Sequence, residues 1–252
     1  MPTCTKSSLA AVTTQLQQDA KKSLAKQVAR CWPADLPAPQ IQVLEGAPVT
    51  CITQYTAGRD FDLVVMGSHG AGFLEQLFLG TTATRLVKRL QLPTLVVRKA
   101  PETNYQKILV PIDFSSYSAS TVQAARRLSP KAEIVLMHAF ESLYEGQMIH
   151  AGVDESTVHT FRVAARQQAA LKIRALAGAS GLTELDYQPQ LVHGRAHKEI
   201  LTVASAQNAD CIAIGKQGKG FLNELLLGSV TKHVLFEATI DVLVQPALEP
   251  ET

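Results

Sequence analysis

The chain has 252 residues, of which 46% are apolar, 18% charged and 6% aromatic, the composition of a folded protein with one large domain or two small ones. Its 24 basic and 22 acidic residues almost cancel, which excludes the strong positive charge of a nucleic-acid-binding protein. No apolar run approaches the ~18–20 residues of a membrane span, and the first residues do not read as a signal peptide, so we expect a cytoplasmic protein without nucleic acid or membrane partners.

Residues 1–100 predict one helix followed by three strands. Apolar side chains recur at helical spacing from Leu9 to Val28, which predicts an amphipathic helix. Short apolar runs then predict strands at 40–44, 63–66 and 94–97. We expect residues 101–104 to link this half of the chain to the next.

Residues 104–252 predict a regular alternation of strands and helices. Strands are expected at 107–113, 133–139, 188–193, 211–214 and 242–244, and helices at 118–128, 158–176, 196–206 and 229–238. A loop is expected at 140–154, and His138, inside an apolar run, is expected to be a core histidine. This alternation predicts an α/β fold with a parallel sheet covered by helices on both faces.

The two halves are related in sequence. Residues 67–80 and 215–228 are identical at eight of 14 positions. The offset of 148 holds without a gap over residues 46–96 and 194–244. Such self-similarity indicates two copies of one folding unit.

The two copies differ in completeness. We place the first unit at 1–100 and the second at 104–252. Residues 104–148 have no counterpart ahead of the first predicted helix. The first unit therefore lacks two strands and a helix that the second unit has.

Both units carry the pattern G-x2-G-x9-G-[ST]. Its residues are Gly67, Gly70, Gly80 and Thr81 in the first unit, and Gly215, Gly218, Gly228 and Ser229 in the second. Each motif follows a buried strand and precedes a helix, where glycines let backbone N–H groups approach an anion and the helix N-terminus attracts it. The pattern predicts a phosphate-binding loop, unless the glycines only shape the loop and Ser229 only caps the helix.

Catalytic and metal-binding patterns do not accompany the glycine motifs. The sequence has no G-x-S-x-G, H-E-x-x-H, G-x4-G-K-[ST] or C-x-x-C. His193 and His197 have the spacing of two metal ligands on a helix, but Gly194 indicates a strand end between them. Around residues 215–230 Glu224 is the only carboxylate. We therefore expect no catalytic residues and no metal site, and a protein that is not an enzyme.

Several stretches resemble the universal stress protein family in its tandem two-unit form. They are the glycine motifs, the V-P-I-D-F-S run at 110–115, Gly194 with Glu199 and Ile200, and Asp210. The resemblance implies an α/β fold of two Rossmann-like units of the adenine nucleotide alpha hydrolase type. The second would have a five-stranded parallel sheet in the order 3-2-1-4-5, and the first would lack its first two strands. Nucleotide-binding members of the family hold ATP at the carboxyl ends of the strands.

Carried over by position, the resemblance implies an ATP site in the second unit. Pro111 and Asp113 would bound the adenosine, Ala139 would meet the adenine edge through its backbone, and Ile214 and Gly215 would lie under the ribose. The phosphates, with Mg²⁺, would be lined by Lys216, Gly218, Gly228, Ser229 and Val230. Lys216 and Gln217 depart from Ser68 and His69 in the first unit, and the lysine would either help to hold an anion or be solvated. For Asp113 the alternative is a cap of the following helix.

The first unit keeps its glycines but lacks the aspartate, so we expect it to bind ATP poorly. Its strand at 40–44 also lacks a partner. We expect this strand to pair with 63–66 or with a strand that another chain supplies. The alternative is that the natural protein begins about fifty residues upstream, as the repeat offset suggests. The resemblance implies that the apolar fifth strands of the two units pair antiparallel as an intrachain pseudo-dimer, and a homodimer is a further partner to consider.

The leading interpretation is an ATP-binding protein with a regulatory role in a stress response and no fast chemistry. One alternative is an enzyme on the same fold, a slow ATPase or a nucleotidyl-transfer relative. The other is an interaction scaffold that holds no nucleotide, in which the two units only form a pseudo-dimer.

Overall fold

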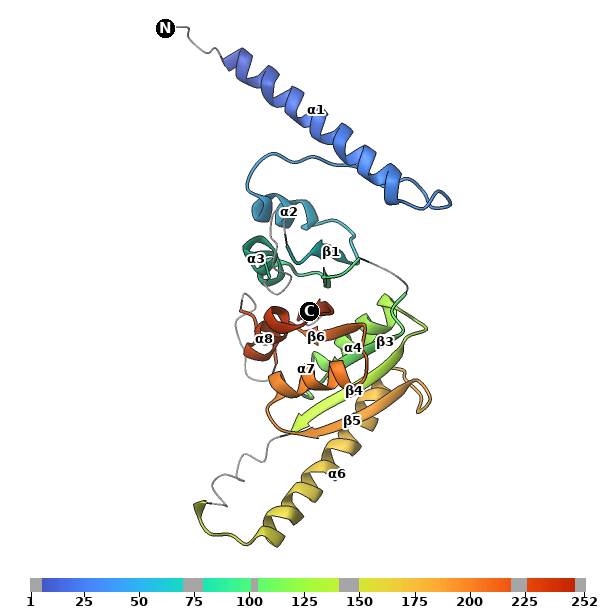
Figure 1. Ribbon diagram of the computed structural model, residues 1–252, viewed down its shortest axis with the longest axis vertical. Helices are drawn as coiled ribbons and strands as arrows, with labels where there is room; N and C mark the ends of the chain where they lie inside the picture. The colour runs from blue at the N-terminus through green and yellow to red at the C-terminus, as the bar shows by residue number, and fades with distance from the viewer. Residues whose placement is uncertain (1–5, 70–78, 101–103, 141–149, 219–225, 248–252) are drawn as a thin grey trace. The chain divides into compact units, whose positions relative to one another are not determined.

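The computed structural model describes residues 6–69, 79–100, 104–140, 150–218 and 226–247. Within them helices alternate with strands in an α/β arrangement (Figure 1). The helices are α1 (Lys6–Cys31), α2 (Pro48–Thr56), α3 (Thr81–Arg89), α4 (Ser118–Leu128), α6 (Glu155–Ala179), α7 (Ala196–Ala206) and α8 (Ser229–Glu237). The strands are β1 (Val64–Gly67), β2 (Thr94–Val97), β3 (Lys107–Pro111), β4 (Glu133–Phe140), β5 (Tyr187–His193), β6 (Cys211–Gly215) and β7 (Asp241–Gln245).

The chain divides into two compact units, residues 1–54 and residues 55–252. The larger unit contains both glycine motifs and all the described strands. The boundary between the compact units therefore lies inside the first sequence repeat, because β2 of the first repeat pairs with β7 of the second. None of the described helices is long and apolar enough to span a membrane.

The smaller unit contains the helix that the sequence predicts, but not the strand. α1 covers the helical segment expected from the apolar periodicity. Residues 37–45 have no regular secondary structure, so the strand predicted at 40–44 is wrong, and with it the predicted closure onto 63–66. The physical reason is a missing neighbour. The equivalent strand β5 pairs with β4, and this sequence holds no counterpart of β4 in the first repeat.

The larger unit is built on a single sheet. Its strands lie in the order β1-β2-β7-β6-β3-β4-β5, and neighbours are parallel except β2 and β7 (Figure 1). The strands of the second repeat stand as β5-β4-β3-β6-β7, which is 3-2-1-4-5 when counted within that repeat. The carboxyl end of β3 thus lies between those of β4 and β6, where the strand order reverses and open α/β sheets bind their ligands.

The two repeats meet at the antiparallel pair of β2 and β7. Leu95 pairs with Leu243, and these residues occupy equivalent positions at the offset of 148. The joint between the repeats therefore has approximate two-fold symmetry. Val96 pairs with Val242 beside it, and both valines are fully buried. The pairing removes two apolar edges that would otherwise invite aggregation.

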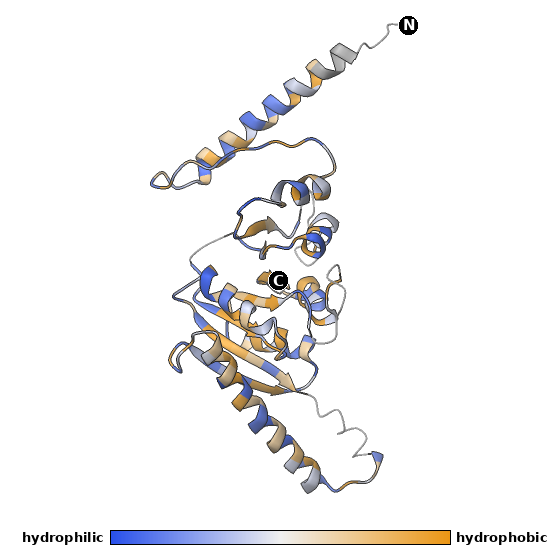
Figure 2. Cartoon of the chain, turned by 180° about the vertical axis from the view of Figure 1, so that it is seen from behind, coloured by the Kyte–Doolittle hydropathy of each residue, from blue (hydrophilic) through white to orange (hydrophobic). Residues whose placement is uncertain are grey.

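Alternate side chains of the strands enter two separate cores. In β3, Ile108 and Val110 pack with residues of α4 and α6, whereas Leu109 packs with residues of α3, α7 and α8. All three side chains are fully buried. Helices therefore cover both faces of the sheet, and orange, apolar stretches run along its strands in Figure 2.

Candidate functional site

A cavity of about 320 Å³ opens at the carboxyl ends of β3, β4 and β6. Of the predicted residues it is lined by Pro111, Asp113, Ala139, Ile214, Gly215, Gly218, Gly228, Ser229 and Val230. Side chains that were not predicted complete its wall, among them His138, Thr121, Gln217 and Thr231. The structure thus brings together every residue predicted for the second repeat except Lys216.

Asp113 follows β3 and stands between a turn and the cavity. Its Oδ1 atom accepts hydrogen bonds from the Ser115 backbone N–H at 2.9 Å and from the Ser118 hydroxyl at 3.2 Å. Phe114, inside this turn, has a left-handed backbone with φ of 59°. Asp113 therefore orders the turn before α4, but it does not cap this helix, whose N-cap is Tyr117 without a side-chain cap bond, so the capping alternative is wrong. Its other oxygen, Oδ2, lies close to Gly218.

His138, near the end of β4, is a wall residue rather than a core histidine. Its Nδ1 atom donates to the Ile112 carbonyl at 2.8 Å, and its ring lies against Phe114 with 4.4 Å between ring centroids. The side chain is half-buried and lines the cavity. The position of His138 close to the carboxyl end of a parallel strand is the signal that sequence reasoning left unused.

The glycine loop of the second repeat is closed at its base by hydrogen bonds. The Gly228 N–H donates to the Lys216 carbonyl at 3.0 Å, and the Thr231 hydroxyl donates to the Gly215 carbonyl at 2.7 Å. The Gln217 side-chain amide donates to the Leu226 carbonyl at 2.8 Å. Residues 219–225 of the loop, with Glu224, lie outside the described residues. These bonds hold the start of α8 next to the end of β6, although the loop separates them in sequence.

The N-terminus of α8 opens onto this cavity. Gly228 occupies the N-cap position and makes no side-chain cap, so the alternative that Ser229 only caps the helix is wrong. Ser229 is instead the first helical residue, and its side chain lines the cavity. The first backbone N–H groups of a helix lack partners within it, and the helix dipole adds positive potential there. This end of the cavity suits an anion.

Glycine is required where the loop meets the rest of the site. A Cβ atom at Gly218 would lie 2.6 Å from Asp113 Oδ2, and one at Gly215 would lie 3.1 Å from the Gln217 carbonyl oxygen. The first distance is shorter than any side chain tolerates without displacing the carboxylate. The motif's second glycine therefore allows the loop backbone to approach Asp113, which joins the two halves of the predicted site.

Lys216 does not line the cavity, which corrects the expectation that it would lie on phosphates or be solvated. Its side chain is 2% exposed, and its Nζ atom donates to the carbonyl of Leu90 at 3.3 Å. Leu90 belongs to the first repeat and follows the last turn of α3. The sequence pattern missed this contact because the partner comes from the other copy. Gln217 takes the wall position instead.

The first repeat reproduces the backbone frame of this loop. The Ser68 N–H donates to the Val97 carbonyl at 2.9 Å, and the Gly80 N–H donates to the Ser68 carbonyl at 2.8 Å. The equivalent bonds in the second repeat run from Lys216 to Gln245 at 2.7 Å and from Gly228 to Lys216 at 3.0 Å. Gly80, like Gly228, caps its helix without a side chain, and Thr81 begins α3. Gly70 lies outside the described residues.

What the described part of the first repeat lacks is the side of the site that carries Asp113 in the second. β1, which ends at Gly67, is the outermost strand of the sheet, whereas its equivalent β6 has β3 beside it. No described residue of the first repeat stands where Asp113 stands in the second. Gly67, Gly80 and Thr81 therefore keep the loop frame without the wall that would face it.

The His193 and His197 pair does not form a metal site. The His193 ring packs against Phe140, and the His197 ring packs against His233 of α8 at a centroid distance of 4.4 Å. Among the described residues no group of three or more His, Cys, Asp or Glu side chains is placed to hold a metal ion.

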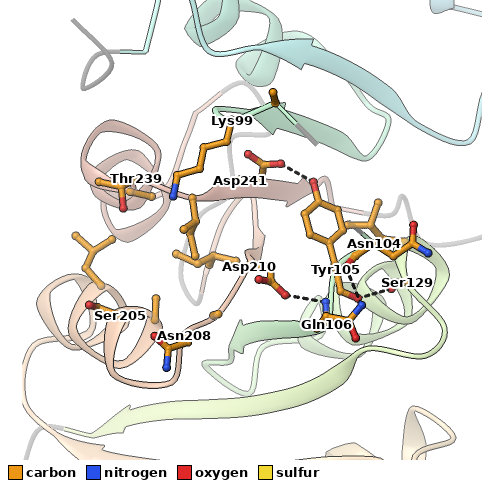
Figure 3. Close-up of a pocket in the computed structure, with 18 of the residues that line it drawn as sticks. Lys99, Asn104, Tyr105, Gln106, Ser129, Ser205, Asn208, Asp210, Thr239 and Asp241 are labelled. Atoms are coloured by element: carbon orange, nitrogen blue, oxygen red, sulfur yellow. Dashed lines mark hydrogen bonds between the residues drawn. The ribbon is translucent and has the colours of Figure 1, made fainter. Parts of the chain in front are cut away.

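A larger cavity, of about 1250 Å³, lies at the other end of the strands, where β3, β6 and β7 begin (Figure 3). It is bounded by the starts of β3, β6 and β7 and by the C-terminal ends of α4, α7 and α8. Helix C-termini carry negative partial charge, and the carboxylates of Asp210, Glu237 and Asp241 add to it. Lys99 and Lys131 also line this cavity and offset part of that negative charge.

The polar groups of the larger cavity hold the fold together. Asp241 Oδ2 accepts from the Tyr105 hydroxyl at 2.6 Å (Figure 3). Asp241 Oδ1 accepts from the Arg98 backbone N–H at 2.7 Å. Asp210 Oδ2 accepts from the backbone N–H groups of Gln106 and Lys107 at 2.7 and 2.9 Å. Burial, and next the bond to Asp241, raise the pKa of Tyr105, and burial lowers the pKa of Arg98. These bonds tie the residues before and after the predicted linker to Asp210 and Asp241, which stand at the starts of β6 and β7.

Comparison with known proteins agrees with the repeated architecture. The model of the universal stress protein family matches residues 4–98 and again residues 104–246. The chain belongs to the universal stress protein family. The two matches correspond to the two sequence repeats, and both glycine motifs fall inside them.

Relatives support the same family, and a solved structure supports the fold. A universal stress protein of Mycobacterium tuberculosis is 29% identical over 203 residues, which cover 76% of this chain but 64% of the relative's length. One of Methanocaldococcus jannaschii is 28% identical over 153 residues, which cover 56% of this chain and 94% of that protein. The crystal structure of a universal stress protein from Archaeoglobus fulgidus matches with a TM-score of 0.69 at 21% identity, covering 96% of this chain and 83% of that chain.

Proposed function

We propose that this universal stress protein binds ATP, or another adenine nucleotide, in its second repeat and that occupancy of the site regulates its role in a stress response. The observation that carries the proposal is the approach of the glycine loop to Asp113, since a Cβ atom at Gly218 would lie 2.6 Å from Asp113 Oδ2. A loop that suits phosphate and a carboxylate that suits ribose hydroxyls are thereby held on one cavity.

The cavity divides into regions that fit the parts of a nucleotide. The side chains of Ile214, Ala139 and Val230 supply apolar surface for a base and ribose. Asp113 supplies an acceptor for ribose hydroxyls, and the first N–H groups of α8, with the Ser229 hydroxyl, supply donors for phosphate. The volume of about 320 Å³ lies at the small end of the ~300–1,000 Å³ typical of ligand pockets. We propose that Mg²⁺ enters on the nucleotide phosphates.

We propose a binding switch rather than an enzyme. Among the described residues that line the cavity, Asp113 is the sole carboxylate, and its Oδ1 atom is held in the turn before α4. Fast hydrolysis needs a base or metal cluster placed at the phosphates. The described wall near the helix N-terminus is made of glycine, serine, valine and threonine, which bind without doing acid–base chemistry.

The test is to release whatever small molecule the purified protein carries. The protein is purified without added nucleotide and denatured, and the supernatant is analysed by mass spectrometry for ATP, ADP and AMP. The apo protein is then titrated with Mg·ATP and Mg·GTP by calorimetry. We expect a stoichiometric adenine nucleotide or measurable ATP binding, with GTP weaker. Absence of both, from a protein shown to be folded, would favour the scaffold without nucleotide.

A further inference from the structure

The two repeats are connected by a buried contact that the proposed nucleotide site does not itself explain. Lys216, in the glycine loop of the second repeat, donates from Nζ to the Leu90 carbonyl of the first repeat at 3.3 Å. Both residues are 2% exposed. We propose that Lys216 is a positioning residue through which α3 of the first repeat orders the phosphate side of the nucleotide site. This inference rests on the function proposed above.

The acceptor is chemically suited to a lysine. Leu90 is the C-cap residue of α3, and its own N–H donates a hydrogen bond to the Leu86 carbonyl. Carbonyl groups at a helix C-terminus lack partners within the helix and carry the negative end of the dipole, so they favour a cation. Because the contact is shielded from water, its electrostatic attraction is stronger than at the surface, and leaving the buried amine without it would be costly. The Lys216 side chain is therefore held in one place.

The backbone of Lys216 transmits this restraint to α8. Its N–H donates to the Gln245 carbonyl at 2.7 Å, and its carbonyl accepts from the Gly228 N–H at 3.0 Å. Gly228 is the N-cap of α8, whose first N–H groups face the cavity. A shift of Lys216 would displace Gly228 and reorient the donors that we assign to phosphate. α3, Lys216 and α8 thus form one chain of direct contacts.

The contact between Lys216 and Leu90 is not symmetric between the two repeats. The residue equivalent to Lys216 is Ser68, and the residue equivalent to Leu90 is Ala238. The Ser68 hydroxyl is hydrogen-bonded to the neighbouring His69 ring at 2.7 Å. The backbone frames of the two loops match, but their side-chain anchors differ. The first repeat lacks the residues that we assign to adenosine. Its role in this proposal is to support the glycine loop of the second repeat.

The experiment compares a ligand that uses the phosphate loop with one that does not. Lys216→Met keeps the length and apolar stem of the side chain and removes the ammonium group. We expect its affinity for Mg·ATP to fall about tenfold while its affinity for adenosine stays within about twofold, since adenosine does not reach α8. Lys131→Met, which removes a lysine that lines the larger cavity, is the matched control and should change neither affinity.

Two results would overturn the inference. Equal loss of ATP and adenosine affinity in Lys216→Met would assign the lysine a general structural role, and unchanged ATP affinity would assign it no role in binding. Failure of the wild type to bind any adenine nucleotide would instead reject the proposed function, which keeps the two failures distinct.

A measurement on the wild type covers the case in which Lys216→Met does not fold. Coupling is reciprocal, so if α3 supports phosphate binding then ATP must stabilise the end of α3. We expect saturating Mg·ATP to slow hydrogen exchange of the Leu90 N–H, which donates to the Leu86 carbonyl, and saturating adenosine to leave it unchanged. Equal exchange with the two ligands would contradict the coupling.

Discussion

The two glycine loops of this chain have the same backbone frame and different surroundings. In both repeats a parallel strand ends in glycine, the next residue bonds to the neighbouring strand, and a glycine N-cap begins the following helix. Among the residues that the structure describes, only the second repeat has a further strand, β3, beside the loop strand, with Asp113 following it. The comparison teaches that a glycine motif specifies a turn and a helix start, and that the cavity we propose for a nucleotide also needs the strand that faces them.

The largest effect on the difference between the two loops should come from filling the space between the second loop and Asp113. Gly218→Val places a branched side chain where a Cβ atom would already lie 2.6 Å from Asp113 Oδ2. We expect ATP affinity to fall by more than ~100-fold, about 2.7 kcal/mol, because loop and carboxylate can no longer approach. Calorimetry measures this loss. The control is Gly70→Val, the same change in the first motif, which should leave ATP affinity unaltered.

Removing the charge of Asp113, which we assign to the adenosine, should have a smaller effect on ATP affinity. Asp113→Asn keeps an oxygen for the Ser115 N–H and Ser118 hydroxyl, so the turn is preserved. It weakens the acceptor offered to the ribose, and we expect ATP and adenosine affinities to fall alike by about tenfold, or ~1.4 kcal/mol. Loss confined to ATP would show that Asp113 acts on the phosphates and not on the adenosine.

A substitution in the larger cavity should lower the free energy of unfolding and leave ATP affinity unchanged. Tyr105→Phe removes the 2.6 Å bond to Asp241 and should lower the free energy of unfolding by about 1–3 kcal/mol. Because the folded state raises the pKa of Tyr105, its contribution is present below the usual tyrosine pKa of ~10 and is lost as the pH rises beyond it. Urea unfolding should therefore show wild type and variant converging above pH ~10. A change in ATP affinity at neutral pH would mean that this edge of the sheet also serves binding.

The smallest expected effect belongs to the first helical hydroxyl. Ser229→Ala removes one of several donors at the start of α8, and we expect about a threefold loss of ATP affinity, or ~0.7 kcal/mol. Thr81→Ala is the equivalent change in the first repeat. An equal loss in both variants would indicate that both loops hold phosphate and would erase the difference between the repeats.

The second repeat could be predicted closely because its signals are local. Strands buried on both faces appear as unbroken apolar runs, so β3, β4, β6 and β7 were visible in the sequence, and β3 ends at Pro111, before the predicted limit at residue 113. Glycine spacing located the loop and the start of α8. The order of elements then brought most of the predicted residues to one cavity.

The errors arose where a residue depends on a partner that sequence spacing does not reveal. Residues 40–44 are apolar enough for a strand, but a strand needs a neighbour, and the counterpart of β4 is absent from the sequence. Lys216 stands at a loop position suited to phosphate, yet its side chain goes to Leu90 of the other repeat. His138 looked like a core residue because its apolar neighbours gave no hint of the cavity at the strand end.

The central claim is that the second repeat, and not the first, holds the nucleotide. It is tested most directly by the stoichiometry of Mg·ATP binding to the apo chain, measured by calorimetry against an independent protein concentration. The account predicts one ATP per chain. Two ATP per chain would show that the loop of the first repeat binds without an adenosine wall, and none would show that neither loop does; either result would contradict the claim.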